Sequence, residues 1–186
     1  MTIGVLSAQA AIFIYKNDST APKAWEDVEH MHLAEGGIRG ELHTNKSDFL
    51  KAVALWNAAV AATNSFLCIY SHAGVQGIAP KPTLEAVIDW QELADALPNG
   101  VQYLWLVGCK TQEALNNWQP LGRPVLPRLL ATDEEFPWQP FLKYFAAEIS
   151  IAPITFDDEM SEHLLRKQPS LAAHTKYFGR DLQPLP

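Results

Sequence analysis

The sequence predicts a single α/β domain over residues 1–186, with a mostly parallel central sheet and helices on both faces. Short runs at 10–15 (AAIFIY), 65–71 (SFLCIYS) and 101–107 (VQYLWLV) are apolar at almost every position. Such runs are typical of strands that are buried on both faces of a parallel sheet. Segments with helical periodicity lie between them, and this alternation favours parallel strands joined by crossover helices.

The first half of the chain contains two further elements of this pattern. A short strand is expected over residues 38–43, and Thr44 or Asn45 can cap the helix that follows. In that helix the apolar side chains recur at steps of four, three and four residues, which places them on one face. They are Phe49, Val53, Trp56 and Val60.

The run from 72 to 83 is expected to be a loop, because it contains two Gly and two Pro. After it, Asp89 and Glu92 form a candidate capping box for a short helix over residues 90–97. The helix leads into the apolar run at 101–107, so the strand–helix alternation continues.

Beyond residue 120 the sequence predicts one more strand and two helices. The strand is expected over residues 124–132, and Pro127 weakens it or places it toward an edge of the sheet. Amphipathic helices are expected over residues 138–149 and 157–167. These elements would complete a sheet with two helical layers.

Charge and hydropathy exclude several classes of partner. The net charge of −7 and a pI near 5.3, without a basic stripe, argue against nucleic acid or an anionic membrane. No apolar run reaches the roughly 18–20 residues of a membrane helix, and the first residues lack the basic start of a secretory signal. We therefore expect a cytoplasmic protein.

The cysteine and histidine content gives no sign of a disulfide framework or a metal site. Cys68 and Cys109 are the only cysteines, and they are not spaced like zinc ligands. Cys68 lies in the middle of a strand and is expected to be a small core side chain. His30 and His32, next to Glu29, lack a third ligand at a suitable spacing. We expect neither a metal nor another cofactor.

Two of the expected strands end next to reactive side chains. The strand at 65–71 runs into His72, and the strand at 101–107 reaches Cys109 after Gly108. Catalytic groups gather beyond the carboxyl ends of parallel strands, so neighbouring strands would bring His72 and Cys109 side by side. His72 would then act as general base or as the imidazolium partner of a Cys109 thiolate.

The same edge offers groups that stabilise the charges of acyl transfer. The backbone N–H of Cys109 and one from Ala73 or Gly74 are candidate donors to an oxyanion, since small residues allow close approach. A short helix that Thr111 can cap is expected after Cys109, and its positive end would point toward Cys109 and favour the thiolate.

This ordered set of segments resembles the caspase-like cysteine peptidases, which include caspases, metacaspases, gingipains, separase and bacterial CHAT domains. The resemblance covers roughly residues 38–149 and rests on ELHTNKSDFLKAV, SFLCIYSHAG, WQELADALPNG, VQYLWLVGC and LLATDEEFPWQPFLKYFAAEI. It implies a caspase-like three-layer sandwich and a thiol protease, a hydrolase in which His72 is the acid or base and Cys109 the nucleophile. The substrate would be a protein or peptide, and a regulatory protein partner is compatible with this family.

The chain departs from the family's pattern in ways that keep alternatives open. Ala73 separates His72 from Gly74, Val107 stands where basic-specific members often have Asp, and no motif identifies a pocket for the substrate side chain. One alternative is a catalytically inactive caspase-like module that binds a protein partner. Another is a different doubly wound binding domain in which Cys109 is inert.

Overall fold

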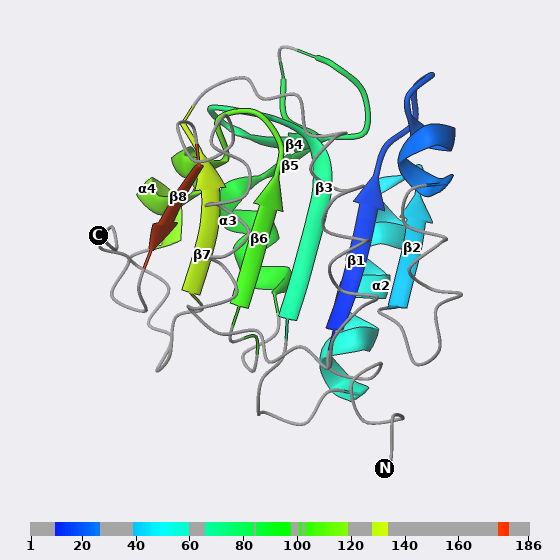
Figure 1. Ribbon diagram of the computed structural model, residues 1–186, viewed down its shortest axis with the longest axis horizontal. Coiled ribbons are helices and arrows are strands. Elements are labelled where there is room, and N and C mark those ends of the chain that lie inside the picture. Colours follow the sequence, from blue (N-terminus) through cyan, green and yellow to red (C-terminus); the bar gives the residue numbers. More distant parts are fainter. Residues whose placement is uncertain are drawn as a thin grey trace.

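A computed structural model describes residues 10–26, 39–59, 66–83, 85–97, 101, 103–118, 128–133 and 175–178. Its main strands are β1 (Ala10–Tyr15), β2 (Arg39–His43), β3 (Phe66–Gly74), β6 (Tyr103–Val107), β7 (Arg128–Thr132) and β8 (Thr175–Phe178). They form one sheet in the order β2-β1-β3-β6-β7-β8, in which only β8 pairs antiparallel (Figure 1). The mostly parallel sheet is confirmed, and the two strands that lead to His72 and Cys109 are parallel neighbours.

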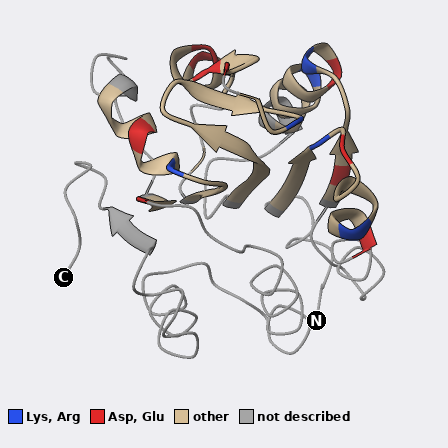
Figure 2. Cartoon of the chain, turned by 90° about the horizontal axis from the view of Figure 1, so that it is seen from above, with Lys and Arg blue, Asp and Glu red and all other residues tan. Residues whose placement is uncertain are grey.

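Three of the described helices form one layer against this sheet. Helices α2 (Lys46–Ala59), α3 (Trp90–Ala96) and α4 (Leu115–Trp118) lie on the same face, as Figures 1 and 2 show from two directions. Beneath them, alternate strand residues pack with the apolar side of α2. This cluster includes Ala11, Phe13, Tyr15, Leu67, Ile69, Leu104 and Leu106 from the strands and Phe49, Val53 and Trp56 from α2.

The opposite face of the sheet is buried as well. Its alternate side chains are at most 2 % exposed at Ile12, Ile14, Cys68, Trp105, Val107 and Leu130. A parallel sheet that is buried on both faces is the centre of a three-layer α/β sandwich, so the fold class predicted from the sequence is confirmed. Cys68 is the small core side chain that its position in mid-strand predicts.

Two of the predicted helix caps are present, one of them in altered form. Asn45 caps α2, because its Oδ1 accepts a hydrogen bond from the Asp48 N–H at 2.9 Å. Asp89 caps α3 by accepting from the Glu92 N–H at 2.7 Å. The Glu92 carboxylate does not complete a capping box: it accepts from Lys46 Nζ at 2.6 Å and thereby ties α3 to α2.

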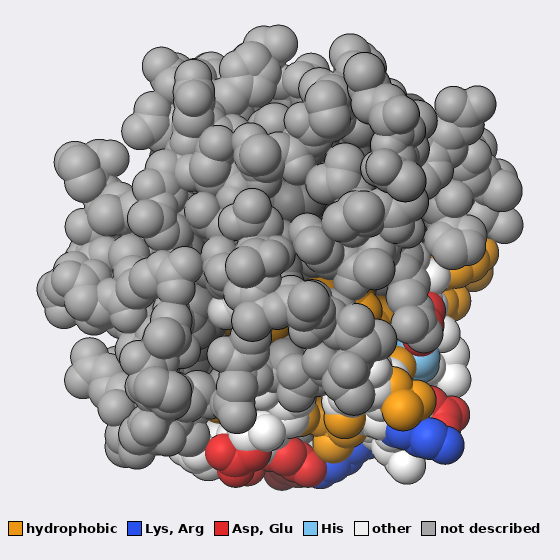
Figure 3. All heavy atoms as spheres, turned by 90° about the horizontal axis from the view of Figure 1, so that it is seen from below, with side chains coloured by type: hydrophobic (Ala, Val, Ile, Leu, Met, Phe, Trp, Pro, Cys, Tyr) orange, Lys and Arg blue, Asp and Glu red, His pale blue; other side chains and the backbone are white. Residues whose placement is uncertain are grey.

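The surface seen from the amino ends of the parallel strands is mixed in its described part. Figure 3 shows acidic, basic and hydrophobic side chains next to one another there. Among the described residues, no helix is both long and apolar enough to cross a membrane.

The prediction of a loop from residue 72 is wrong, because β3 continues to Gly74. Ser71 is the last residue of β3 in register with β1, and the next three residues pair antiparallel with β4 (Gly77–Ala79). The last three residues of β3 therefore pair with β4 instead of with the parallel strands β1 and β6. The local sequence hardly indicates this hairpin, since only three residues form its second strand.

A glycine closes this hairpin tightly. Gly77 has φ of 155°, and a Cβ at this position would lie 2.1 Å from the carbonyl oxygen of Ile88. Ile88 belongs to the short strand β5 (Ile88–Asp89), which pairs antiparallel with β4. The close contact between β4 and β5 thus requires glycine at position 77.

The far side of the sheet differs from the prediction. β7 lies between β6 and β8, so the residues after Pro127 do not form an edge strand. β8, at residues 175–178, was not predicted from the sequence. The helices predicted over 138–149 and 157–167, and the pair His30 and His32, lie outside the described residues.

Candidate functional site

The register of the three central strands brings three polar side chains to one edge of the sheet. Tyr70 of β3 lies opposite Ile14 of β1 on one side and Val107 of β6 on the other. The residues two positions further along lie where each chain segment leaves this parallel register. They are Lys16, His72 and Cys109, all at the carboxyl ends of the strands.

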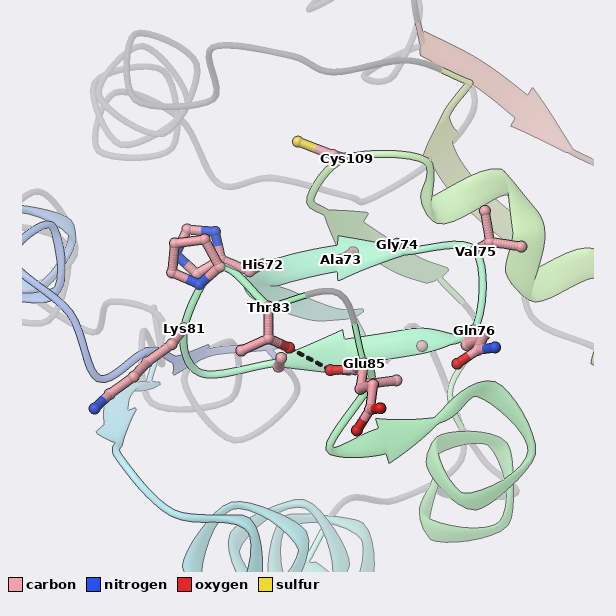
Figure 4. Close-up of a pocket in the computed structure, with 13 residues that line it drawn as sticks. His72, Ala73, Gly74, Val75, Gln76, Lys81, Thr83, Glu85 and Cys109 are labelled. Carbon is pink, nitrogen blue, oxygen red and sulfur yellow. Dashed lines mark hydrogen bonds between the residues drawn. The ribbon is translucent and has the colours of Figure 1, made fainter.

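His72 and Cys109 line the same pocket, which has a volume of about 570 Å³. Figure 4 shows both side chains extending toward the same side, His72 from β3 and Cys109 from the turn after β6. Other walls come from the β3–β4 hairpin and from the segment after it, which contributes Lys81 and Glu85. The pocket is thus an open site between two strand ends.

Asp18 is the partner of His72 at this edge. The Asp18 Oδ2 and the His72 Nε2 form a hydrogen bond, and the two side chains are 15 % and 28 % exposed. The other carboxylate oxygen accepts from the Thr20 N–H at 2.9 Å and from the Thr20 hydroxyl at 2.7 Å. Because Asp18 occupies Nε2, Nδ1 is the ring nitrogen that remains for the pocket.

These contacts keep Asp18 ionised. Burial alone raises the pKa of the Asp18 carboxyl, but hydrogen bonds from Thr20 and His72 and the charge of Lys16 outweigh it. The pKa falls from the ordinary 3.8 to about 2. His72 therefore faces a carboxylate, which fixes the orientation of its ring.

The loop that carries Asp18 is attached to the hairpin that carries His72. The Asn17 N–H donates to the Pro80 carbonyl at 2.6 Å, and the Lys16 N–H donates to the His43 carbonyl at 3.1 Å. These backbone bonds hold the carboxyl end of β1 between β2 and the hairpin.

Lys16 is a buried cation next to the same group. It is 4 % exposed, its Nζ donates to the Thr20 hydroxyl at 2.8 Å, and the same atom lies 4.6 Å from the centroid of the Tyr70 ring. Burial lowers the pKa of Lys16, whereas the charges of Asp18 and of a Cys109 thiolate raise it. The charges of Asp18 and Cys109 therefore both affect the pKa of Lys16.

The turn at Cys109 packs tightly against the end of β3. A Cβ on Gly108 would lie 2.7 Å from the Ser71 carbonyl oxygen and 2.9 Å from the Ala73 Cβ, so only glycine fits there. The Thr132 hydroxyl donates to the Gly108 carbonyl at 2.6 Å. Cys109 itself is partly buried, at the rim of the pocket.

The predicted helix cap after Cys109 is wrong. The chain forms a short 3₁₀ turn, η2 (Thr111–Ala114), which continues into the four residues of α4. Thr111 does not cap this turn: its hydroxyl donates to the Leu106 carbonyl at 2.9 Å and accepts from the Thr132 N–H at 3.0 Å. Elements this short supply little of the dipole that was expected to favour the thiolate.

The candidate oxyanion donors lie around the pocket. Ala73 and Gly74 line it together with Cys109, but they belong to β3, where they are in register with Ile78 and Gly77 of β4. Their position in a hairpin differs from the loop that the sequence suggested. The part of the chain that the structure describes contains no group of three His, Cys, Asp or Glu side chains that could hold a metal ion.

Lys16 and Asp18 were missed from the sequence. The segment from 16 to 23 (KNDSTAPK) has the composition of a polar loop, and nothing in it suggests a partner for His72. One signal was present: these residues directly follow the first buried strand, as His72 and Cys109 follow theirs.

Comparison of the chain with models of known protein families found no match. No curated protein matches it either.

Proposed function

We propose that this protein is a caspase-like cysteine endopeptidase that cleaves peptide bonds with His72 and Cys109. The observation that carries the proposal is that the two residues come from neighbouring parallel strands and line one pocket. The hydrogen bond from His72 to the ionised Asp18 supports it, because an oriented imidazole is the usual partner of a catalytic thiol.

The reaction follows from these groups. The Cys109 thiol passes its proton to His72 Nδ1, and the sulfur attacks the carbonyl carbon of the scissile bond. The backbone N–H groups of Cys109 and of Ala73 or Gly74 are the proposed donors to the oxyanion. When the tetrahedral intermediate collapses, the C–N bond breaks and the leaving amine takes the proton from His72.

Water completes the cycle. His72 accepts a proton from a water molecule while the oxygen of that water attacks the thioester formed on Cys109. The C–S bond then breaks, the carboxylic acid product leaves, and the proton returns to the sulfur. Asp18 stabilises the imidazolium in both halves of the cycle without taking the proton itself.

The alternative proposal is a catalytically inactive module of the same type that binds a protein partner. The observation in its favour is the hairpin, since Ala73 and Gly74 are in register with β4 instead of lying in an open loop. In that case Cys109 would be a thiol at the rim of a binding pocket.

A peptide-library digest tests the proposal. Wild type, Cys109→Ala, His72→Ala and Cys68→Ala are incubated with peptides that vary at the residue before the cleaved bond, with and without Ca²⁺. We expect cleavage by wild type and Cys68→Ala and none by the other two variants. Equal cleavage by Cys109→Ala would overturn the mechanism, and cleavage by none of the four would favour the binding module.

A further inference from the structure

The helix that was expected to favour the Cys109 thiolate is replaced by a four-residue turn. Another positive group lies on the same edge of the sheet. Ile14, Tyr70 and Val107 are in register on the three central strands, and Lys16, His72 and Cys109 each come two residues later. Lys16 is almost completely buried.

The Lys16 side chain contacts both its own loop and the neighbouring strand. Its Nζ donates to the Thr20 hydroxyl and lies over the ring of Tyr70, a residue of β3. β3 lies between β1 and β6, and β6 leads to Cys109. The buried cation therefore lies over the strand that is the direct neighbour of β6.

We propose that the Lys16 ammonium acts directly on Cys109 and favours its thiolate. This inference rests on the proposed function in taking Cys109 as the nucleophile. The geometric basis is the burial of Lys16 and its place over β3, and the effect of a Cys109 charge in raising the pKa of Lys16 agrees with it. A buried charge acts through protein of low effective permittivity. Its electrostatic effect on a thiolate is therefore larger than that of an exposed charge at a similar separation.

The other charged groups near Cys109 have a weaker or opposite effect. Lys81, Glu85 and Lys110 are exposed, so water screens them. Asp18 is negative and opposes the thiolate, while His72 favours it only when protonated. Among the described groups around the thiol, Lys16 is the buried amine that can carry a positive charge.

The test measures the rate at which iodoacetamide alkylates Cys109 between about pH 6 and pH 10, because only the thiolate reacts. Lys16→Met removes the charge and keeps an unbranched side chain that is one heavy atom shorter, and Lys16→Arg keeps the charge. We expect Lys16→Met to react about tenfold more slowly than wild type at pH 6 and equally fast at pH 10, where an accessible thiol of ordinary pKa is ionised. Lys16→Arg should stay within about twofold of wild type across the range.

A second pair of variants separates a direct effect from one that passes through His72. His72→Gln removes the titrating ring and retains an N–H donor for Asp18. We expect Lys16→Met to slow alkylation at pH 6 by the same factor in this background. If Lys16→Met unfolds, as circular dichroism would show, Lys16→Gln takes its place.

Three results would overturn the inference: equal rates at pH 6, the same slowing at both pH values, or slowing that disappears in the His72→Gln background. Alkylation requires no turnover of peptide. A protein without peptidase activity whose alkylation depends on Lys16 would therefore contradict the proposed function and still support this inference.

Discussion

At the residue scale, the imidazole of His72 has two sides with different neighbours. Nε2 is hydrogen-bonded to Asp18, and the rest of the ring lies at the pocket that Cys109 also lines. A carboxylate on one ring nitrogen selects the tautomer and the orientation of the other nitrogen. This division gives each of the three side chains a separate task in the proposed reaction.

Asp18 should affect stability in acid. Its pKa is about 2 in the folded protein and ordinarily 3.8, so it binds a proton more readily when the chain is unfolded. Its contribution is therefore complete above about pH 4 and is lost as the pH falls toward 2. Asp18→Asn has no carboxyl at this position. Between about pH 5 and pH 2.5, its free energy of unfolding, measured with urea, should therefore fall less than that of wild type. An equal loss in both proteins would contradict this account.

The two cysteines should differ in reactivity and in their effect on stability. Burial raises the pKa of the Cys68 thiol, whereas Cys109 lies at the rim of the pocket. Cys68→Ala should cost about 1 kcal/mol of unfolding free energy, because it leaves a small cavity, and should leave alkylation unchanged. Cys109→Ala should abolish alkylation near neutral pH at little cost in stability. Mass spectrometry and thermal unfolding distinguish the two patterns, and a label on Cys68 in the folded protein would contradict them.

At the element scale, the site depends on how closely the ends of β3 and β6 approach. The contact at Gly108 leaves no room for a side chain, since a Cβ there would meet the Ser71 carbonyl at 2.7 Å. The approach of these two ends holds the Cys109 turn next to the residue that begins the β3–β4 hairpin.

Gly108→Ala should therefore destabilise the protein and displace the Cys109 turn. Relief of the backbone contact should cost about 1–3 kcal/mol, as overpacking does elsewhere. Gly74→Ala is the matched stability control, because a Cβ on Gly74 meets nothing within 4 Å. Urea unfolding of both variants checks the contrast. Equal stabilities would show that the ends of β3 and β6 can separate at no cost.

The start of α3 offers a second contrast between neighbouring polar groups. Asp89 accepts the hydrogen bond of an N-cap, so Asp89→Ala should cost about 1 kcal/mol. The ion pair between Lys46 and Glu92 is 40 % and 36 % exposed, so Lys46→Ala should cost less than about 0.5 kcal/mol. Chemical denaturation measures both values, and the reverse order would contradict this account of the helix.

The sequence predicts elements well where one local signal dominates. The apolar runs of β1, β3 and β6 and the caps at Asn45 and Asp89 each depend on a few adjacent residues. Prediction from the sequence fails where the local structure depends on a residue that is distant in the sequence. The extension of β3 depends on pairing with β4, and Thr111 leaves its expected cap to bond Leu106 and Thr132.

At the scale of the whole molecule, the fold explains why distant residues share one site. Parallel strands all end at the same edge, so residues near 16, 72 and 109 meet although long segments separate them. The pair His72 and Cys109 could be proposed from the sequence because each residue type is informative by itself. Asp18 and Lys16 could not, because their role depends on the order of the strands.

The central claim is that His72 and Cys109 act as one unit, and thiol alkylation at about pH 6 tests it most directly. Wild type, His72→Ala and Cys109→Ala are treated with iodoacetamide, and peptide mapping locates the label. We expect rapid labelling of wild type at Cys109, labelling at least about tenfold slower in His72→Ala, and none in Cys109→Ala. Labelling of Cys109 at equal rates in wild type and His72→Ala would contradict the claim.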